Sequence, residues 1–113
     1  MKRPENTEYS DWYAGYVGSV QETDIISALE KQSDEIKQFF AEITDEKSLY
    51  RYAENKWTIK ELLGHIIDGE RVFAYRALRF SRNDETALAG FDENPYVAQS
   101  NFNERTLFLL SIL

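Results

Sequence analysis

The sequence of 113 residues contains no cysteine and a single histidine. The lack of cysteine excludes disulfides, thiolate nucleophiles and cysteine-based zinc sites. No apolar run is long enough to cross a bilayer, and the residues after Met1 are charged and polar, unlike a signal peptide. We therefore predict one cytoplasmic domain over residues 1–113, with no membrane partner.

Basic residues are outnumbered by acidic ones, and the formal net charge is −7. Four arginines do gather late in the chain, but acidic residues are interleaved with them: Arg71, Arg76, Arg79 and Arg82. Such mixed charge is typical of a solvated helix face rather than of a surface that binds phosphates. We expect no nucleic-acid partner.

Hydrophobic periodicity predicts an all-α protein. Residues 23–43 carry apolar side chains at three- and four-residue steps, with Thr23 or Asp24 as the N-cap. Residues 58–82 continue this pattern without proline, and residues 102–113 look like the start of a third helix. Residues 1–22 show no periodicity, so we predict an irregular arm there that packs on the helices.

The clearest local signal is the start of the second helix. Thr58 and Glu61 have the spacing of a capping box, in which each side chain satisfies an amide of the first turn. Asn83 is a plausible terminator of this helix. For the third helix, Asn101 with Glu104 is a weaker candidate capping box.

The only histidine, His65, lies on the shoulder of the apolar stripe of helix 58–82. From the residues alone it is a metal ligand, a catalytic base or a core histidine. Asp68 is its only close acidic neighbour on the helix, which gives too few ligands for a metal. Glu70 falls near the centre of the stripe, where a carboxylate needs a partner. Gly69 indicates either a closely crossing helix or space for a ligand.

Nucleophilic and phosphate-binding motifs are lacking as well. No Gly-x-Ser-x-Gly sequence places a serine on a sharp turn, and the five glycines are isolated. These two absences argue against a serine hydrolase and against a glycine-rich phosphate loop.

Three sequence blocks resemble the DinB-like/YfiT-like superfamily of metal-dependent helical enzymes: KWTIKELLGHIIDGERVFAYRALRF, DETALAGFDENPYV and NFNERTL. The resemblance implies an up-down-down-up four-helix bundle, usually dimeric, of which this sequence would cover the arm and about two and a half helices. It implies a nickel or zinc ion held by three histidines, with His65 as the first. The implied activity is that of a hydrolase or a thiol-dependent transferase. Asp68, Glu70 and Arg76 are candidates to surround the metal or line the site.

The sequence departs from this pattern in one respect. The other two histidines, expected at His-x-x-x-His spacing on a fourth helix, do not occur in it. We therefore expect these 113 residues to be inactive alone, and they need not bind a metal. The uncovered apolar faces favour a homodimer or a domain-swapped homo-oligomer. Two alternatives stay open: a non-catalytic helical oligomer, or a small-molecule-binding module, each with a structural His65.

Overall fold

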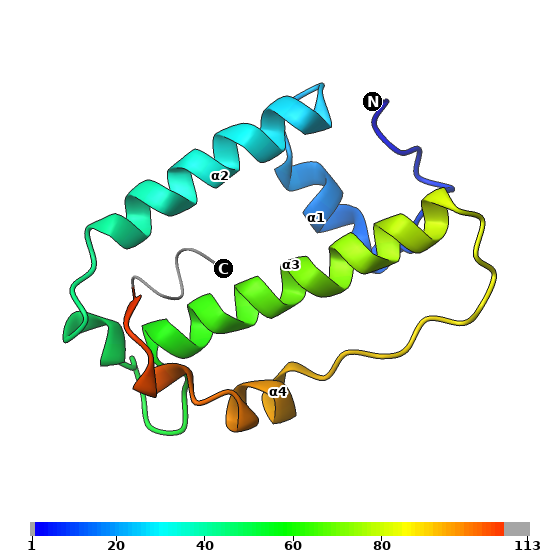
Figure 1. Cartoon of the computed structure of the whole chain (residues 1–113). Coiled ribbons are helices and arrows are strands. Elements are labelled where there is room, and N and C mark those ends of the chain that lie inside the picture. Colours follow the sequence, from blue (N-terminus) through cyan, green and yellow to red (C-terminus); the bar gives the residue numbers. More distant parts are fainter. Residues whose placement is uncertain (1, 108–113) are drawn as a thin grey trace. The chain divides into compact units, whose positions relative to one another are not determined.

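A computed structural model describes residues 2–107 of the chain, and every regular element in this range is helical (Figure 1). The predicted all-α class is thereby confirmed. The chain divides into two compact units, Met1–Glu42 and Ile43–Leu113. In chain order the elements are η1 Asp11–Tyr13, α1 Ala14–Ser19, α2 Ile25–Ala41, η2 Lys47–Leu49, α3 Ile59–Ser81, α4 Glu93–Gln99 and η3 Phe102–Glu104.

The N-terminal unit is more regular than the sequence predicted. The segment 1–22 was expected to be irregular, yet it contains η1 and α1. Three aromatic rings pack against each other there: the ring centroid of Trp12 lies 4.8 Å from that of Tyr13 and 5.5 Å from that of Tyr16. Arg3 donates hydrogen bonds to the carbonyls of Val17 and Val20, at the end of α1. These contacts outweigh the low helix propensity of the two glycines in this stretch.

Helix α2 begins at the second of its two candidate caps. The Asp24 carboxylate accepts a hydrogen bond of 2.9 Å from the Ser27 amide, which identifies Asp24 rather than Thr23 as the N-cap. Ile26, Leu29 and Phe39 of this helix lie exposed, whereas Phe40 is buried.

Helix α3 confirms the predicted capping box. The Thr58 hydroxyl accepts from the Glu61 amide at 3.1 Å, and the Thr58 amide donates to the Glu61 carboxylate at 2.7 Å. The helix ends at Ser81, and Asn83 beyond it has a φ of 51°. Asparagine tolerates this left-handed conformation, which explains why Asn83 terminates the helix.

The segment after α3 is tied back to it by two arginines. Arg79 Nε lies 2.5 Å from Asp84 Oδ2, and Arg79 also donates to the carbonyl of Thr86. This guanidinium lowers the pKa of Asp84 to about 2. Arg76 donates to the carbonyl of Ala89 at 2.9 Å, so the segment runs back along α3 toward α4 (Figure 1).

Helix α4 occupies part of what the sequence marked as a long connection. Its N-cap, Asp92, accepts from the Asn94 amide at 3.2 Å. Pro95 stands in the first turn, where a missing amide hydrogen costs little. Both signals are visible in the sequence, but a helix of two turns leaves little periodicity to detect.

The predicted helix over residues 102–113 is corrected in its first part. Phe102–Glu104 forms only a 3-10 turn, and Arg105 after it is extended. Asn101 adopts the left-handed conformation, with φ 54° and ψ 32°, and its side chain makes no cap. A capping residue needs extended backbone instead, so the proposed Asn101–Glu104 box does not form. Residues 108–113 lie outside the described part of the chain.

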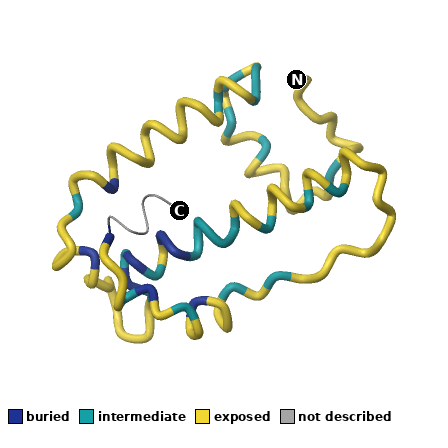
Figure 2. The backbone as a smooth tube through the Cα atoms, in the orientation of Figure 1, coloured by how far each residue is buried: buried dark blue, intermediate teal, exposed yellow. Residues whose placement is uncertain are grey.

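The core of the C-terminal unit lies where the first turns of α3 meet η3 (Figure 2). Its buried apolar side chains are Leu63, Val97, Phe102 and Leu107. A Cβ placed on Gly64 would overlap the Phe102 ring, so the absence of a side chain at this position admits η3. At Gly69, where the sequence indicated either a closely crossing helix or space for a ligand, nothing among the described residues lies within 4 Å of such a Cβ. The close approach is found at Gly64 instead, and the space for a ligand at Gly69 stays a prediction.

Polar side chains hold the same junction together. The Thr58 hydroxyl donates to Asn103 Oδ1 at 2.6 Å, and Asn103 Nδ2 donates to Glu61 at 2.9 Å. Asn103 thus joins the capping box of α3. Thr58 is almost fully buried, at 2% exposure, so its hydrogen bonds are shielded from water.

Replacing Thr58 by alanine tests this junction. We expect Thr58→Ala to lower the free energy of unfolding by about 1–2 kcal/mol, because it removes both the cap and the bond to Asn103. Urea denaturation followed by circular dichroism measures this loss, and hydrogen exchange should locate it in the first turn of α3. Thr58→Ser keeps the hydroxyl and should retain most of the stability. Equal losses for the two variants would show that the methyl group, not the hydroxyl, matters.

The two glycines of α3 give a matched pair of substitutions with opposite signs. Gly64→Ala should destabilise the protein by about 3 kcal/mol, because the new methyl group displaces the Phe102 ring. Gly69→Ala should stabilise it by up to about 1 kcal/mol through helix propensity. Both are measured by urea denaturation. A Gly64→Ala variant as stable as the parent would mean that Phe102 does not pack there.

Candidate functional site

His65 lies in the second turn of α3, between two aromatic rings. Its imidazole centroid is 5.0 Å from the Trp57 ring, at an interplanar angle of 45°. On another side it stacks on Phe91, with centroids 6.2 Å apart and an angle of 8°. Trp57 precedes the N-cap of α3 and Phe91 precedes the N-cap of α4, so the starts of two helices place the aromatic rings around His65.

The edge of the imidazole has an unused polar atom. Nδ1 of His65 is buried and has no hydrogen-bond partner among the described residues. A buried polar atom left unpaired costs about 1–3 kcal/mol. A ring nitrogen can remove this cost by coordinating a metal or by bonding to a ligand, so the side chain is chemically available.

The three residues predicted to accompany His65 lie in different environments. Asp68 is largely covered, with its side chain 20% exposed, and accepts from Arg71 Nη1 at 3.3 Å. Arg76 is engaged with the carbonyl of Ala89 and lies 5.7 Å from the Phe73 ring. None of these contacts reaches His65.

Glu70 differs from its expected setting. The helical pattern placed it near the centre of a buried stripe, but it is exposed and forms no ion pair within residues 2–107. The reason is that α3 is buried mainly over its first turns, at Lys60, Leu63 and Gly64, whereas its later turns are largely uncovered. A carboxylate in this position is solvated and needs no partner.

A complete metal site is not formed by the described residues. Nowhere in residues 2–107 do three His, Cys, Asp or Glu side chains gather in a way that could hold a metal ion. A three-ligand centre of the kind found in catalytic zinc sites needs more than one imidazole. This part of the chain therefore fits the implied metal only through a single ligand, His65.

Sequence reasoning did not identify Phe91 as a neighbour of His65. The two residues are 26 positions apart, and their stacking depends on the segment that Arg76 and Arg79 tie back along α3. The one available signal was the position of Phe91 directly before a capping aspartate, as Trp57 stands directly before a capping threonine.

Comparison with known proteins identifies the family. The model of the DinB superfamily matches residues 28–107, which cover α2 from its fourth residue onward and all of η2, α3, α4 and η3. The chain belongs to the DinB superfamily, and its all-helical content agrees with the helical bundle of that family. No curated protein and no solved structure matches the chain. Within residues 2–107, none of the helices combines the length and the apolarity that a membrane span requires.

Proposed function

We propose that the protein acts as part of a divalent-metal-dependent DinB-type enzyme, a hydrolase or a thiol-dependent transferase, in which His65 is one metal ligand. Family membership supports the metal, nickel or zinc, since imidazole suits both. The observation that carries the proposal is the buried, unpaired Nδ1 of His65. A histidine with a purely structural role would ordinarily have its buried nitrogens hydrogen-bonded.

The aromatic neighbours of His65 also suit a ligand. Rings on two sides restrict the imidazole to a narrow range of orientations, which lowers the entropy lost when a metal binds. The remaining ligands are not supplied by a cluster within residues 2–107. We therefore propose that other groups complete the centre, and that catalysis requires them.

Because the chain has a single histidine, its imidazole signals can be assigned in NMR spectra without mutagenesis. We expect titration with Zn²⁺ to shift the Nδ1 resonance of His65, and Ni²⁺ to broaden the ring protons. His65→Ala should remove the histidine-dependent part of metal binding, which is weak in this chain because the described residues supply a single ligand.

Glu30→Gln serves as the control for this experiment, because it removes an exposed carboxylate of α2 that is not predicted to lie near the metal. We expect it to leave the imidazole response in place. Metal binding that is equally tight in His65→Ala, or imidazole signals that do not respond to excess metal, would contradict the ligand role.

A second proposal concerns self-association. Several large apolar side chains on α3 are exposed in the single chain, among them Leu62, Phe73, Leu78 and Phe80. Monomeric proteins rarely leave so many large apolar groups of one helix in water. We propose that this helix packs against a second copy in a homodimer or a domain-swapped homo-oligomer.

Introducing one charge on the apolar surface tests this association. Phe73→Glu should shift the protein toward the monomer in analytical ultracentrifugation at micromolar concentration, because burying the new carboxylate is costly. Gln38→Glu adds the same charge at an exposed polar position of α2 and should leave the association unchanged. A parent protein that is already a monodisperse monomer at this concentration would overturn the proposal.

A further inference from the structure

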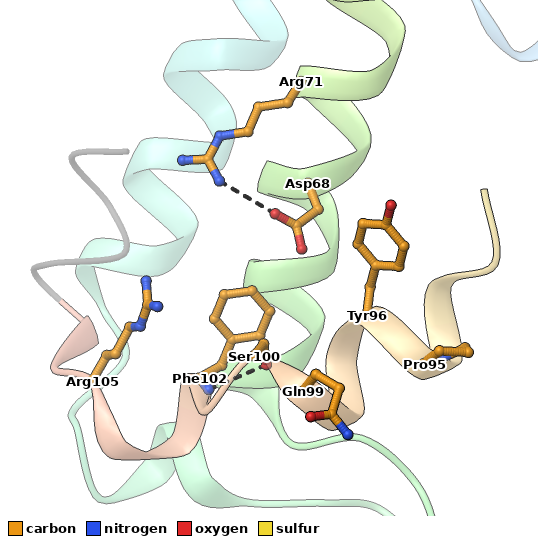
Figure 3. A pocket seen from close by; sticks show the side chains of 8 residues that line it. All are labelled: Asp68, Arg71, Pro95, Tyr96, Gln99, Ser100, Phe102 and Arg105. Carbon is orange, nitrogen blue, oxygen red and sulfur yellow. Dashed lines mark hydrogen bonds and ion pairs between the residues drawn. The ribbon is translucent and has the colours of Figure 1, made fainter. Parts of the chain in front are cut away.

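A cavity of about 460 Å³, open to solvent on one side, lies in the C-terminal unit beside α3, α4 and η3 (Figure 3). This volume falls in the range of sites for small molecules. The residues that matter for its chemistry are Asp68 and Arg71 of α3, Tyr96 and Gln99 of α4, Phe102 of η3 and Arg105 after it. His65 is not among the residues that line it.

The charges around the cavity favour an anion. Two guanidinium groups, of Arg71 and Arg105, and a single carboxylate, that of Asp68, line the cavity. Asp68 occupies only one nitrogen of Arg71, Nη1, at 3.3 Å. Arg105 forms no ion pair within residues 2–107, and its guanidinium carbon lies 5.7 Å from the centroid of the Phe102 ring. The cavity is thus locally positive in a protein whose net charge is −7.

The walls of the cavity add an aromatic component. The Phe102 ring is buried, at 5% exposure, and in Figure 3 it lies between Arg105 and Tyr96. Phe91 contacts Tyr96 edge to face, at a centroid distance of 4.9 Å. Its own ring is 55% exposed, so it can receive a flat group. Aromatic pairs of this kind contribute beyond the area that they bury.

The polar atoms at the edge of the cavity differ in availability. The Ser100 hydroxyl is occupied, because it donates to the carbonyl of Val97 at 2.7 Å and accepts from the Phe102 amide at 3.3 Å. The Gln99 amide, in contrast, makes no hydrogen bond within the described residues and can donate to an incoming oxygen.

We propose that this cavity binds a small aromatic carboxylate. Arg105 pairs with the carboxylate through two parallel hydrogen bonds, for which its planar fork is suited, and Arg71 adds a second positive charge. The aromatic body lies against the exposed ring of Tyr96. Binding at this site requires no metal, so it extends the proposed function without depending on it.

Benzoate is the probe that tests this proposal, in a buffer with a chelator so that metal binding at His65 plays no part. We expect saturable shifts of the Gln99 side-chain amide and of the backbone amides of Ser100 and Phe102 in ¹H–¹⁵N spectra. Benzamide, the neutral analogue, should bind at least about tenfold more weakly, because it lacks the charge that the arginines recognise. Acetate and inorganic phosphate, which lack a ring, should also bind more weakly than benzoate.

Matched arginine variants locate the site. Arg105→Gln should weaken benzoate binding by about tenfold or more, whereas Arg51→Gln, an exposed arginine that does not line the cavity, changes the net charge equally and should have no effect. Circular dichroism checks that both variants are folded. Arg105→Lys should recover only part of the affinity, because lysine keeps the charge but not the fork.

Asp68→Asn should change the affinity in the opposite direction. It removes the one negative charge of the cavity and releases Arg71, so benzoate should bind several-fold more tightly. A gain of affinity cannot result from damage to the fold. The proposal is overturned if benzoate causes no saturable shifts, if benzamide, acetate or phosphate binds equally well, or if Arg105→Gln binds like Arg51→Gln. Each of these outcomes leaves the metal test at His65 unaffected.

Discussion

The hydrogen bond between the Thr58 hydroxyl and Asn103 joins two segments that are 45 residues apart, and much of the C-terminal unit depends on it. Thr58 already caps α3, and Asn103 also donates to Glu61, so the three side chains fix each other's positions. This bond holds η3 at the start of α3 and brings Phe102 over Gly64. Phe102 also lines the cavity. The hydrogen bond between Thr58 and Asn103 therefore positions both the core and a candidate binding site.

A second tie strengthens this junction from another side. The carboxylate of Asp45 accepts a hydrogen bond of 2.8 Å from the Leu107 amide and lies 3.2 Å from the ammonium group of Lys60. The hydrogen bond from the Leu107 amide lowers the pKa of Asp45 most, and the bond from Lys60 lowers it further. The carboxylate therefore stays charged at neutral pH. Lys60 itself is 5% exposed, and a lysine so buried needs such a partner. Polar groups therefore join Asp45 before α3, Lys60 within it and Leu107 after it, in addition to the apolar packing of the unit.

Local signals in the sequence were sufficient for the helices, but not for the contacts between them. Thr58 with Glu61, Asp24 and Asn83 mark helix ends through hydrogen bonds within a few residues, and the structure has all of them in these roles. The choice between Gly64 and Gly69 as the point of close approach depends on where η3 lies, which no local pattern states. The exposure of Glu70 has the same origin, since a helical stripe predicts which residues share a face but not how far along the helix that face is covered.

The candidate site shows the same division. The family and the histidine could be recognised from the sequence, because both are properties of short blocks of residues. The setting of His65 could not, because it depends on Phe91 returning along α3 through the hydrogen bonds of Arg76 and Arg79. Phe91 in turn contacts Tyr96, which lines the cavity. A ligand that displaced Tyr96 would therefore also displace Phe91, and through Phe91 it would change the packing around the imidazole of His65. This chain of aromatic contacts gives a physical route by which occupancy of the cavity can alter the orientation of the proposed metal ligand.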